Sequence, residues 1–368
     1  MDILRQSSGH GFNRADKRPE KRGLQLLRLL SILPVASFRA FLRPVGSIDI
    51  LYAKCTKSEF TDAVAVGVWI ADKAGGAMAE VGLLPFARVA LEVATAVLPR
   101  YRSRFSKHPF SQPPLLAVLC LMRYEDWTFR ETEVRLREHR ELRKVLQLQS
   151  VPDYTTLCRF LKRLDDQTID QALGEAVRRM GNTGPPRRRA RIAVDATGLA
   201  QGAVSPFFVR RMGQHTNQPL PWRHWLKWLV AVAVDRQLLL SQTARRGPWN
   251  DCGNLPGLVQ AASRQTRIGW VLAAAEFDSE RNHTDIRQQL QAQSILPAKR
   301  GKKTWTIHGV RAEMRRAFPR RQYARRALVE TVFSPVKRKL SARAPGRTLP
   351  LQQRQALLLG LSYNLYRL

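Results

Sequence analysis

One carboxylate stands in a strongly cationic stretch near the C-terminal end of the sequence. Residues 301–350 hold fourteen Lys or Arg side chains and only two acids, one of which is Glu330. The spacing singles out four residues that could act together: Tyr323, Arg326, Glu330 and Lys337. An α-helix turns by about 100° per residue, so all four would fall on one narrow face. A carboxylate beside two cations suits metal-dependent chemistry on a phosphate backbone, although an exposed Arg326–Glu330 ion pair fits the same spacing.

A second carboxylate follows a predicted strand in the middle of the chain. Ile192 and Val194 alternate with other residues before Asp195, so a strand over residues 191–199 would carry this acid towards its C-terminal end. Phosphodiester chemistry can use two Mg²⁺ ions roughly 3.5–4 Å apart, held by a few carboxylates. Asp195 and Glu330 are therefore the candidate catalytic residues and metal ligands, with Mg²⁺ or Mn²⁺ as the expected cofactor.

The charge of the chain indicates the class of its partner. The 368 residues include 62 Lys and Arg against 29 Asp and Glu, which gives a formal net charge of +33 and a sequence pI of about 11.3. Nucleic acid is favoured because cations that neutralise phosphates release counterions whatever the base sequence. An anionic membrane surface is a weaker alternative, and a merely solubilising surplus is seldom so one-sided.

Cysteine usage and hydropathy predict a cytoplasmic protein. The four cysteines are far apart and form no Cys-x-x-Cys pair, which argues against a zinc site or a disulfide framework. Two of them, Cys120 and Cys158, lie among apolar residues and are expected in the core. Residues 24–38 are apolar but are interrupted by Arg28 and Pro34, and the stretch is too short to span a bilayer. We therefore expect a soluble, nucleoid-associated protein.

Residues 1–95 form an extension with little interpretable pattern. Its Arg-rich opening fits either a targeting peptide or a start codon assigned too far upstream, in which case Met78 is an alternative start. Apolar side chains at mixed three- and four-residue spacing predict a helix over residues 83–97.

Residues 96–180 are predicted to form a helical, DNA-binding domain. Helices are expected to begin at Pro113 and after Asp153, with a further charge-laced helix over residues 128–146.

The segment after Asp153 offers short polar side chains followed by Arg159 and Arg163, which is typical of the second helix of a helix-turn-helix. An ordinary basic amphipathic helix explains the same residues equally well. Arg159 and Arg163 are the candidate DNA contacts of this domain.

Residues 181–190 combine turn formers with a basic run and are interpreted as a linker. Residues 191–368 are predicted to form an α/β domain in which helices cover a mixed sheet. The basic and aromatic stretch 204–225 suits a nucleic-acid surface or a small aromatic core. The predicted strands cover residues 191–199, 228–234, 237–242, 270–275 and 294–297, and the predicted helices include 253–263, 283–290 and 351–365.

These residues resemble those of bacterial insertion-sequence DDE transposases. The family signature Tyr-x2-Arg-x3-Glu-x6-Lys is matched by Tyr323, Arg326, Glu330 and Lys337. The strand that ends in Val-Asp-Ala-Thr-Gly at residues 194–198 is similar to the family segment with the first catalytic aspartate. The resemblance covers about residues 98–368.

The resemblance implies a ribonuclease-H-like catalytic core in which Asp195 and Glu330 bind metal. It implies that Tyr323, Arg326 and Lys337 position DNA near that metal. The implied activity is DNA strand cleavage followed by strand transfer. The implied partners are double-stranded DNA, as terminal inverted repeats and target DNA, and a second copy of the chain in a homodimer.

One position departs from the family pattern. The second aspartate of the family ends a later strand in a pattern like Ala-Asp-Ala-(Gly/Glu)-(Tyr/Phe)-Asp-Ser, whereas residues 273–279 read Ala-Ala-Ala-Glu-Phe-Asp-Ser. Ala274 stands at the position of the acid, and Asp278 or Glu276 is a weak substitute. A methyl group cannot bind a metal, and a ligand displaced by ~1 Å can cost on the order of 10²-fold in rate. We therefore expect a weakened or inactive transposase; the alternatives are a non-catalytic DNA-binding regulator derived from one, or a nuclease of the same fold.

Overall fold

The computed structural model describes residues 81–103, 105, 109–181, 189–201, 225–247, 249–299 and 307–368. All of these belong to one compact unit, Thr61–Leu368. The interpretations of residues 1–80, of most of the linker and of residues 204–224 lie outside the described residues. No helix of the described chain is long and apolar enough to cross a membrane.

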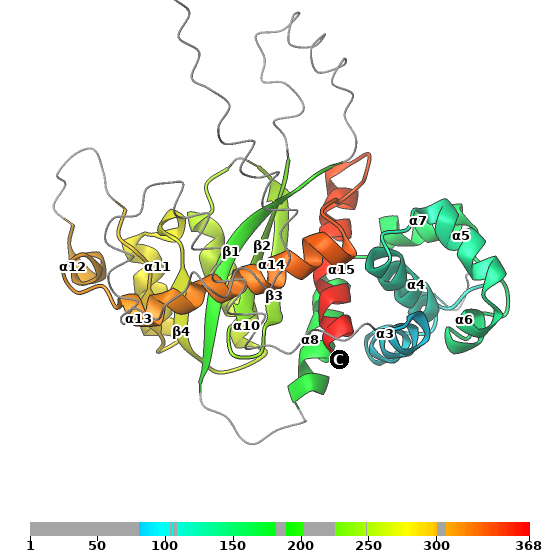
Figure 1. Cartoon of the computed structure of the whole chain (residues 1–368), viewed down its shortest axis with the longest axis horizontal. Helices are drawn as coiled ribbons and strands as arrows, with labels where there is room; N and C mark the ends of the chain where they lie inside the picture. Colours follow the sequence, from blue (N-terminus) through cyan, green and yellow to red (C-terminus); the bar gives the residue numbers. More distant parts are fainter. Residues whose placement is uncertain are drawn as a thin grey trace, which may run out of the picture. The chain divides into compact units, whose positions relative to one another are not determined.

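The described chain opens with helices (Figure 1). The predicted helix 83–97 is confirmed, and the boundary expected at residue 95 falls inside it. Helices also begin near Pro113 and after Asp153, as predicted; the side chain of Asp153 accepts the N–H of Thr156 and so caps its helix. These elements are α3 (Leu83–Val97), α4 (Gln112–Tyr124), α5 (Phe129–Glu138), α6 (Arg140–Val145), α7 (Tyr154–Arg163) and α8 (Asp166–Gly181).

The prediction of one continuous helix over residues 128–146 is wrong. The backbone of His139 leaves the helical region at φ −95° and ψ 89°, so the segment divides into α5 and α6. The guanidinium of Arg143 donates to the carbonyl oxygens of Leu136 and Arg137 at 2.6 and 2.5 Å. These bonds satisfy carbonyls that the end of α5 would otherwise leave without a partner.

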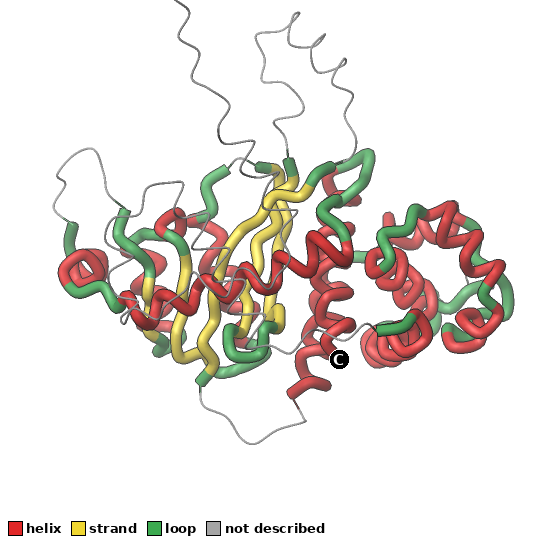
Figure 2. Tube along the Cα trace, viewed as in Figure 1, coloured by secondary structure: helices red, strands yellow, loops and turns green. Residues whose placement is uncertain are grey.

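The strands form one mixed sheet in the order β3-β2-β1-β4-β5, which confirms the predicted fold class. β1 pairs antiparallel with β2 and parallel with β4, and Figure 2 shows the strands as a layer with helices around it. The β2–β3 hairpin is as predicted, with longer strands than expected. The strands are β1 (Ala190–Leu199), β2 (Leu226–Ala233), β3 (Leu238–Arg246), β4 (Ile268–Ala273) and β5 (Gln293–Ile295).

Helices bury both faces of the sheet. On one face, Ile192 and Val194 share a core with apolar residues of α10 (Leu255–Ser263) and η6 (Asp285–Gln289), next to α11 (Glu280–Thr284). On the other face, Ala193 and Trp228 share a core with α15 (Leu349–Arg367) and with the helical path over residues 320–340. Alternation along β1 therefore sends Asp195 to the second face, together with Ala193.

The helical path over residues 320–340 is not one regular α-helix. It consists of α13 (Arg320–Tyr323), the 3₁₀ segment η7 (Ala324–Val329), α14 (Glu330–Pro335) and the π segment η8 (Val336–Leu340). Each change of helix type shifts the angle between successive side chains. The expectation of a single α-helical face is therefore wrong in detail. Pro335, which lacks a backbone N–H, lies inside the interrupted part.

Candidate active site

Asp195 lies inside β1, and position 274 directly follows the C-terminal end of the parallel strand β4. β1 and β4 pair in a register that sets Val194 beside Ala273, so the following residues of the two strands are Asp195 and Ala274. β1 also packs against η7, which brings the C-terminal stretch to this edge of the sheet. The strand pairing thus brings the backbone of the first acid level with the alanine that replaces the expected second acid, and the side chain of Ala274 packs against the core of Ile192 and Val194 on the other face of the sheet.

Arg326 binds Asp195 directly. Its Nη1 donates to Oδ2 of Asp195 at 2.7 Å. The side chain of Arg326 is 20% exposed and that of Asp195 is 16% exposed. The other oxygen of Asp195, Oδ1, accepts the backbone N–H of Ala196 at 2.9 Å. The guanidinium carbon of Arg326 lies 5.8 Å from the ring centre of Tyr323. Within the described residues the ion pair of Arg326 is therefore with Asp195, 131 positions away in sequence, and not with Glu330 on its own helix.

The carboxylates of the site act on each other electrostatically. Burial raises the pKa of Asp195, although Arg326 and the N–H of Ala196 oppose the rise. Burial also raises the pKa of Glu330, and the charge of Asp195 raises it further, against the effects of Arg326 and Lys337. Burial raises the pKa of Tyr323 as well. Asp195 thus bonds Arg326 directly, Tyr323 lies against Arg326, and the charges of Asp195, Arg326 and Lys337 act on Glu330.

Asp278 belongs to a different network. The guanidinium of Arg311 donates to both of its oxygens, over 2.8–3.1 Å, and the N–H of Lys299 donates to Oδ2 at 2.8 Å. The Nε2 of the buried His283 lies 3.6 Å from Oδ1. Burial would raise the pKa of Asp278, but these hydrogen bonds outweigh it and lower the pKa to about 2. The network shares no residue with the Asp195–Arg326 pair, which weighs against the prediction that Asp278 substitutes for the missing acid.

The residues present fit one divalent cation better than two. Among the described residues there is no group of three or more Asp, Glu, His or Cys side chains that could hold a metal ion. Asp195 and Glu330 remain as a pair of hard oxygen donors, and Mg²⁺ often binds through one or two carboxylates while keeping several waters. A second ion would need a further donor at the strand end, where the methyl group of Ala274 offers none.

The sequence patterns did not identify one buried acid near the site, Asp251. Asp251 is 1% exposed and pairs with Lys227 at 2.5 Å and Arg245 at 2.8 Å. Its charge contributes to the raised pKa of Asp195. A signal was available, because Asp251 follows the C-terminal end of β3, a strand that runs in the same direction as β1.

Arg159 and Arg163 lie on the exposed side of α7. The buried side of this helix consists of Leu157, Phe160 and Leu161, so the cations are left facing outward. α7 packs against α5, and Glu133 of α5 accepts the N–H of Tyr154 at 2.8 Å. Two packed helices with a basic outer side are compatible with the helix-turn-helix interpretation.

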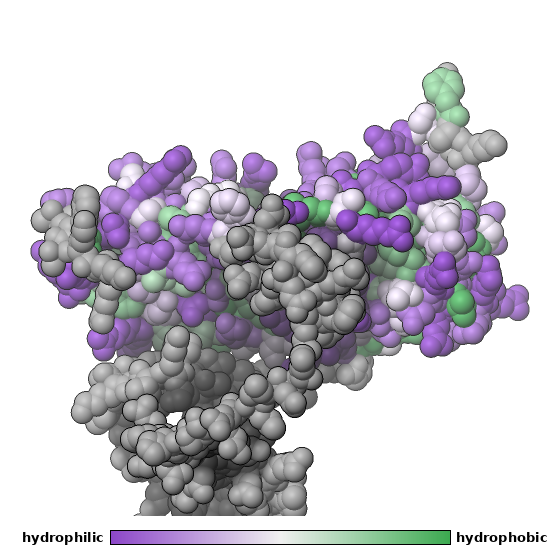
Figure 3. Space-filling view, turned by 90° about the horizontal axis from the view of Figure 1, so that it is seen from above, coloured by the Kyte–Doolittle hydropathy of each residue, from purple (hydrophilic) through white to green (hydrophobic). Residues whose placement is uncertain are grey.

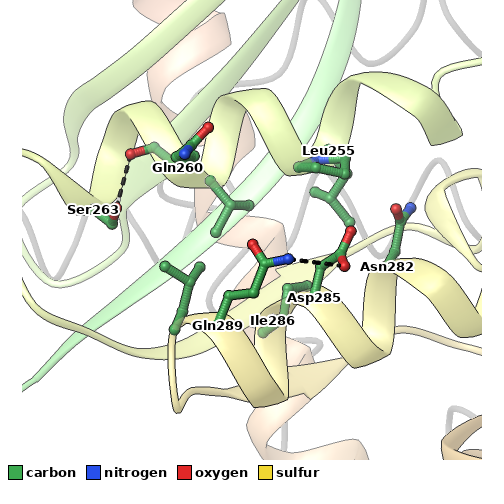
Figure 4. Close-up of a pocket in the computed structure, with 10 residues that line it drawn as sticks. Leu255, Gln260, Ser263, Asn282, Asp285, Ile286 and Gln289 are labelled. Carbon is green, nitrogen blue, oxygen red and sulfur yellow. Dashed lines mark hydrogen bonds between the residues drawn. The ribbon is translucent and has the colours of Figure 1, made fainter.

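A cavity on the opposite face of the sheet has a different character (Figure 4). It has a volume of about 230 Å³ and lies between α10 and the α11–η6 segment. Its lining includes Asp285, hydrogen-bonded by Gln289 at 3.3 Å, and no Lys or Arg. A phosphate would meet an acid there instead of a cation, so this cavity does not extend the Asp195 site.

The visible described surface in Figure 3 is largely hydrophilic, in keeping with the charge of the chain.

Comparisons with known proteins agree with this geometry. The family model of the transposase DDE domain matches residues 186–365, which contain the sheet, Asp195 and the signature residues. The transposase domain (DUF772) matches residues 83–163, from α3 to α7. No curated protein matches the chain. The DDE domain implies a ribonuclease-H-like fold, which the mixed sheet with its flanking helices confirms. Through these two domains the chain belongs to the insertion-sequence DDE transposases.

Proposed function

We propose that this transposase cuts DNA at the ends of its own element and joins the freed 3′ ends to target DNA, with Asp195 and Glu330 as the metal-binding carboxylates. The observation that carries the proposal is the meeting of β1 with the 320–340 path. It places two partly buried acids, Asp195 and Glu330, where their charges and those of Arg326 and Lys337 act on one another. A bound divalent cation would activate the attacking oxygen and polarise the phosphate.

The cationic side chains have a separate role in this proposal. Arg326 and Lys337 lie in the electric field of Glu330, where they can hold the phosphate backbone against the carboxylates. Tyr323 lies against Arg326 and restricts its guanidinium. The basic side of α7 supplies binding to the terminal repeats. We place the working protein in the cytoplasm, beside the nucleoid, and as a homodimer that holds two element ends.

The activity of this copy is proposed to be weak because of Ala274. The change Ala274→Asp adds a carboxylate beside Asp195 at the strand end, so cleavage of DNA with the terminal repeats should rise by on the order of 10²-fold. The repeats are identified as inverted sequences in the DNA that flanks the gene. Cleavage and strand transfer are measured separately with Mg²⁺ or Mn²⁺, which also distinguishes a transposase from a nuclease of the same fold.

Two controls belong to this experiment. Ala275→Asp adds the same charge one residue later and should not increase cleavage. Asp195→Asn and Glu330→Gln, each made in the Ala274→Asp background, should abolish the gain. Equal cleavage by the unaltered protein and by Ala274→Asp would show that the alanine does not limit the reaction.

A second candidate function is favoured by the same alanine. A protein that binds the terminal repeats without cutting them would act as a regulator of related elements, and it would need α7 but no complete metal site. Repeat binding that Asp195→Asn leaves unchanged, with no cleavage under either metal, supports the regulator.

A further inference from the structure

Arg326 occupies an oxygen of Asp195 that a divalent cation would use. Its Nη1 lies 2.7 Å from Oδ2, and Oδ1 already accepts the N–H of Ala196 at 2.9 Å. Both side chains of the ion pair are mostly buried, so water competes weakly for the contact. Each oxygen of Asp195 is thus engaged by the chain itself.

This contact cannot be released by loss of a proton. A guanidinium stays charged in proteins, so the only way to free Oδ2 is to move the side chain of Arg326. Repulsion opposes a simple alternative in which cation and guanidinium share the carboxylate. The nearby Lys337, whose charge also acts on Glu330, adds to that repulsion.

A DNA phosphate offers Arg326 a better place. The guanidinium carries five N–H donors in a planar fork that matches phosphate oxygens, and the bond to Asp195 is made by Nη1 alone. The guanidinium carbon lies 5.8 Å from the ring centre of Tyr323, whose side chain also forms a hydrogen bond with Arg326. Arg326 can therefore exchange one carboxylate oxygen for a bidentate contact with phosphate.

We propose that Arg326 is a switch that controls metal binding in response to DNA. Without DNA, Arg326 stays bonded to Asp195 and blocks binding of a divalent cation. When DNA binds, a phosphate takes the guanidinium away from Asp195, which can then bind the cation. The proposal rests on the proposed function, because it takes Asp195 as a metal ligand and DNA as the substrate. It adds that metal and DNA bind with positive coupling, each increasing the affinity of the other by the same factor.

The test is a titration of the full-length protein with Mn²⁺, with and without a saturating DNA duplex. Free Mn²⁺ is counted by electron paramagnetic resonance, and the duplex alone serves as the blank. The variants are Arg326→Gln, which removes the charge, and Arg325→Gln as the matched control. Arg325 is the adjacent residue, is 46% exposed and pairs with the surface acid Asp235 at 3.7 Å. Asp195→Asn defines binding that does not depend on the site.

In the unaltered protein, DNA should tighten Mn²⁺ binding by about 5- to 150-fold, the usual range of such coupling. Arg326→Gln should bind Mn²⁺ more tightly without DNA and lose the gain from DNA, whereas Arg325→Gln should behave like the unaltered protein. Equal affinity of the unaltered protein and Arg326→Gln without DNA, or a gain that persists in Arg326→Gln, overturns the switch.

Two further variants keep these outcomes interpretable. Thermal unfolding checks that Arg326→Gln is folded; if it is not, Arg326→Lys keeps the charge with a single-point donor and should bind Mn²⁺ with intermediate affinity. Ala274→Asp supplies the third carboxylate and serves as the reference for a working metal site. If neither it nor Arg326→Gln binds more Mn²⁺ than Asp195→Asn, the proposed metal site fails together with the switch.

Discussion

At the residue scale, the chain has an alanine where its family has an acid, yet keeps the aspartate four positions later. Asp278 is 8% exposed and accepts hydrogen bonds from Arg311 and from the N–H of Lys299. These bonds fix the turn after β4 to the start of α12 (Gly309–Arg316) and to the strand-end segment that follows β5. The contacts explain a structural role for Asp278 that needs no metal.

The first prediction concerns the pH dependence of that role. The pKa of Asp278 is about 2 in the folded protein, below the ordinary value of about 3.9 in an unfolded chain. Its contribution to the free energy of unfolding is therefore complete above about pH 4 and is lost as the pH falls towards 2, and it amounts to about 2–3 kcal/mol. Urea unfolding of Asp278→Asn should show a loss of that size at pH 7 and only about a third of it near pH 2.5.

Asp285→Asn is the matched control for this measurement. Asp285 lies in the adjacent segment, and its ion pair with Arg281 is long, at 3.8 Å, with Arg281 87% exposed. Exposed pairs of this kind contribute little, so the control should change the free energy of unfolding by less than about 1 kcal/mol. If Asp278→Asn and Asp285→Asn lower the free energy of unfolding by the same amount, Asp278 is not the stabilising acid.

At the element scale, α7 is the helix whose type and start the sequence predicted well. Asp153 caps it, and the apolar residues Leu157, Phe160 and Leu161 fall on its inner side, so Arg159 and Arg163 must face outward. The break of the neighbouring segment at His139 was not predictable in the same way. It depends on Arg143 reaching back to two carbonyl groups, which is a contact between helices and not a property of helix propensity.

The second prediction is that α7 binds DNA through these two cations. Arg159→Gln combined with Arg163→Gln should weaken binding to a DNA duplex at every sequence. If both contact phosphates, the slope of log affinity against log salt should become less negative by about 1.8, since each phosphate contact contributes about 0.9. Fluorescence anisotropy over a range of salt concentrations measures both quantities.

Arg135→Gln provides the comparison for α7. Arg135 is 50% exposed on the neighbouring helix α5, and Glu138 lies 3.6 Å from it and already offsets its charge. Its replacement should leave affinity and salt slope nearly unchanged. A double variant of α7 with the salt slope of the unaltered protein would exclude Arg159 and Arg163 as phosphate contacts.

At the scale of the whole molecule, the C-terminal helix α15 joins the helical region to the sheet. Ser362 donates to the carbonyl oxygen of Cys120 in α4 at 3.0 Å. Asn364 accepts the N–H of Leu239 at 3.1 Å and donates to its carbonyl oxygen at 2.8 Å. The regions predicted as separate domains on either side of residues 181–190 therefore share one core through α15.

The third prediction follows from the position of Asn364. β3 is an edge strand of the described sheet, and Asn364 pairs with backbone groups of Leu239 that are buried under α15. Asn364→Leu would leave a buried N–H and a buried carbonyl without partners, at about 1–3 kcal/mol each. The free energy of unfolding in urea should fall by roughly 2–6 kcal/mol.

Arg367→Gln is the control on the same helix. Arg367 donates a long, 3.5 Å hydrogen bond to the carbonyl oxygen of Arg236, so its loss should cost less than about 0.5 kcal/mol. If Asn364→Leu lowers the free energy of unfolding by no more than Arg367→Gln does, the buried amide of Asn364 does not stabilise the packing of α15 on β3.

The sequence by itself determined most of the elements and the family signature, and it named the residues that we propose carry the chemistry. The alternation before Asp195 predicted β1, and the spacing of Tyr323, Arg326, Glu330 and Lys337 identified the family signature. Such inferences succeed because they depend on side-chain type and on periods of two or about 3.6 residues, which are local properties. Position 274 could be compared with the family pattern for the same reason.

Only the tertiary structure decided which of these residues meet. The register of β1 with β4 placed Asp195 beside Ala274, and the interrupted path over residues 320–340 turned Arg326 towards Asp195 in place of Glu330. Asp278 was drawn to Arg311, and the buried Asp251 entered the electrostatics of the site. These outcomes depend on packing between segments that are far apart in the sequence, 33 residues for Asp278 and Arg311 and 131 for Asp195 and Arg326, and on the burial of charge, neither of which a local pattern encodes.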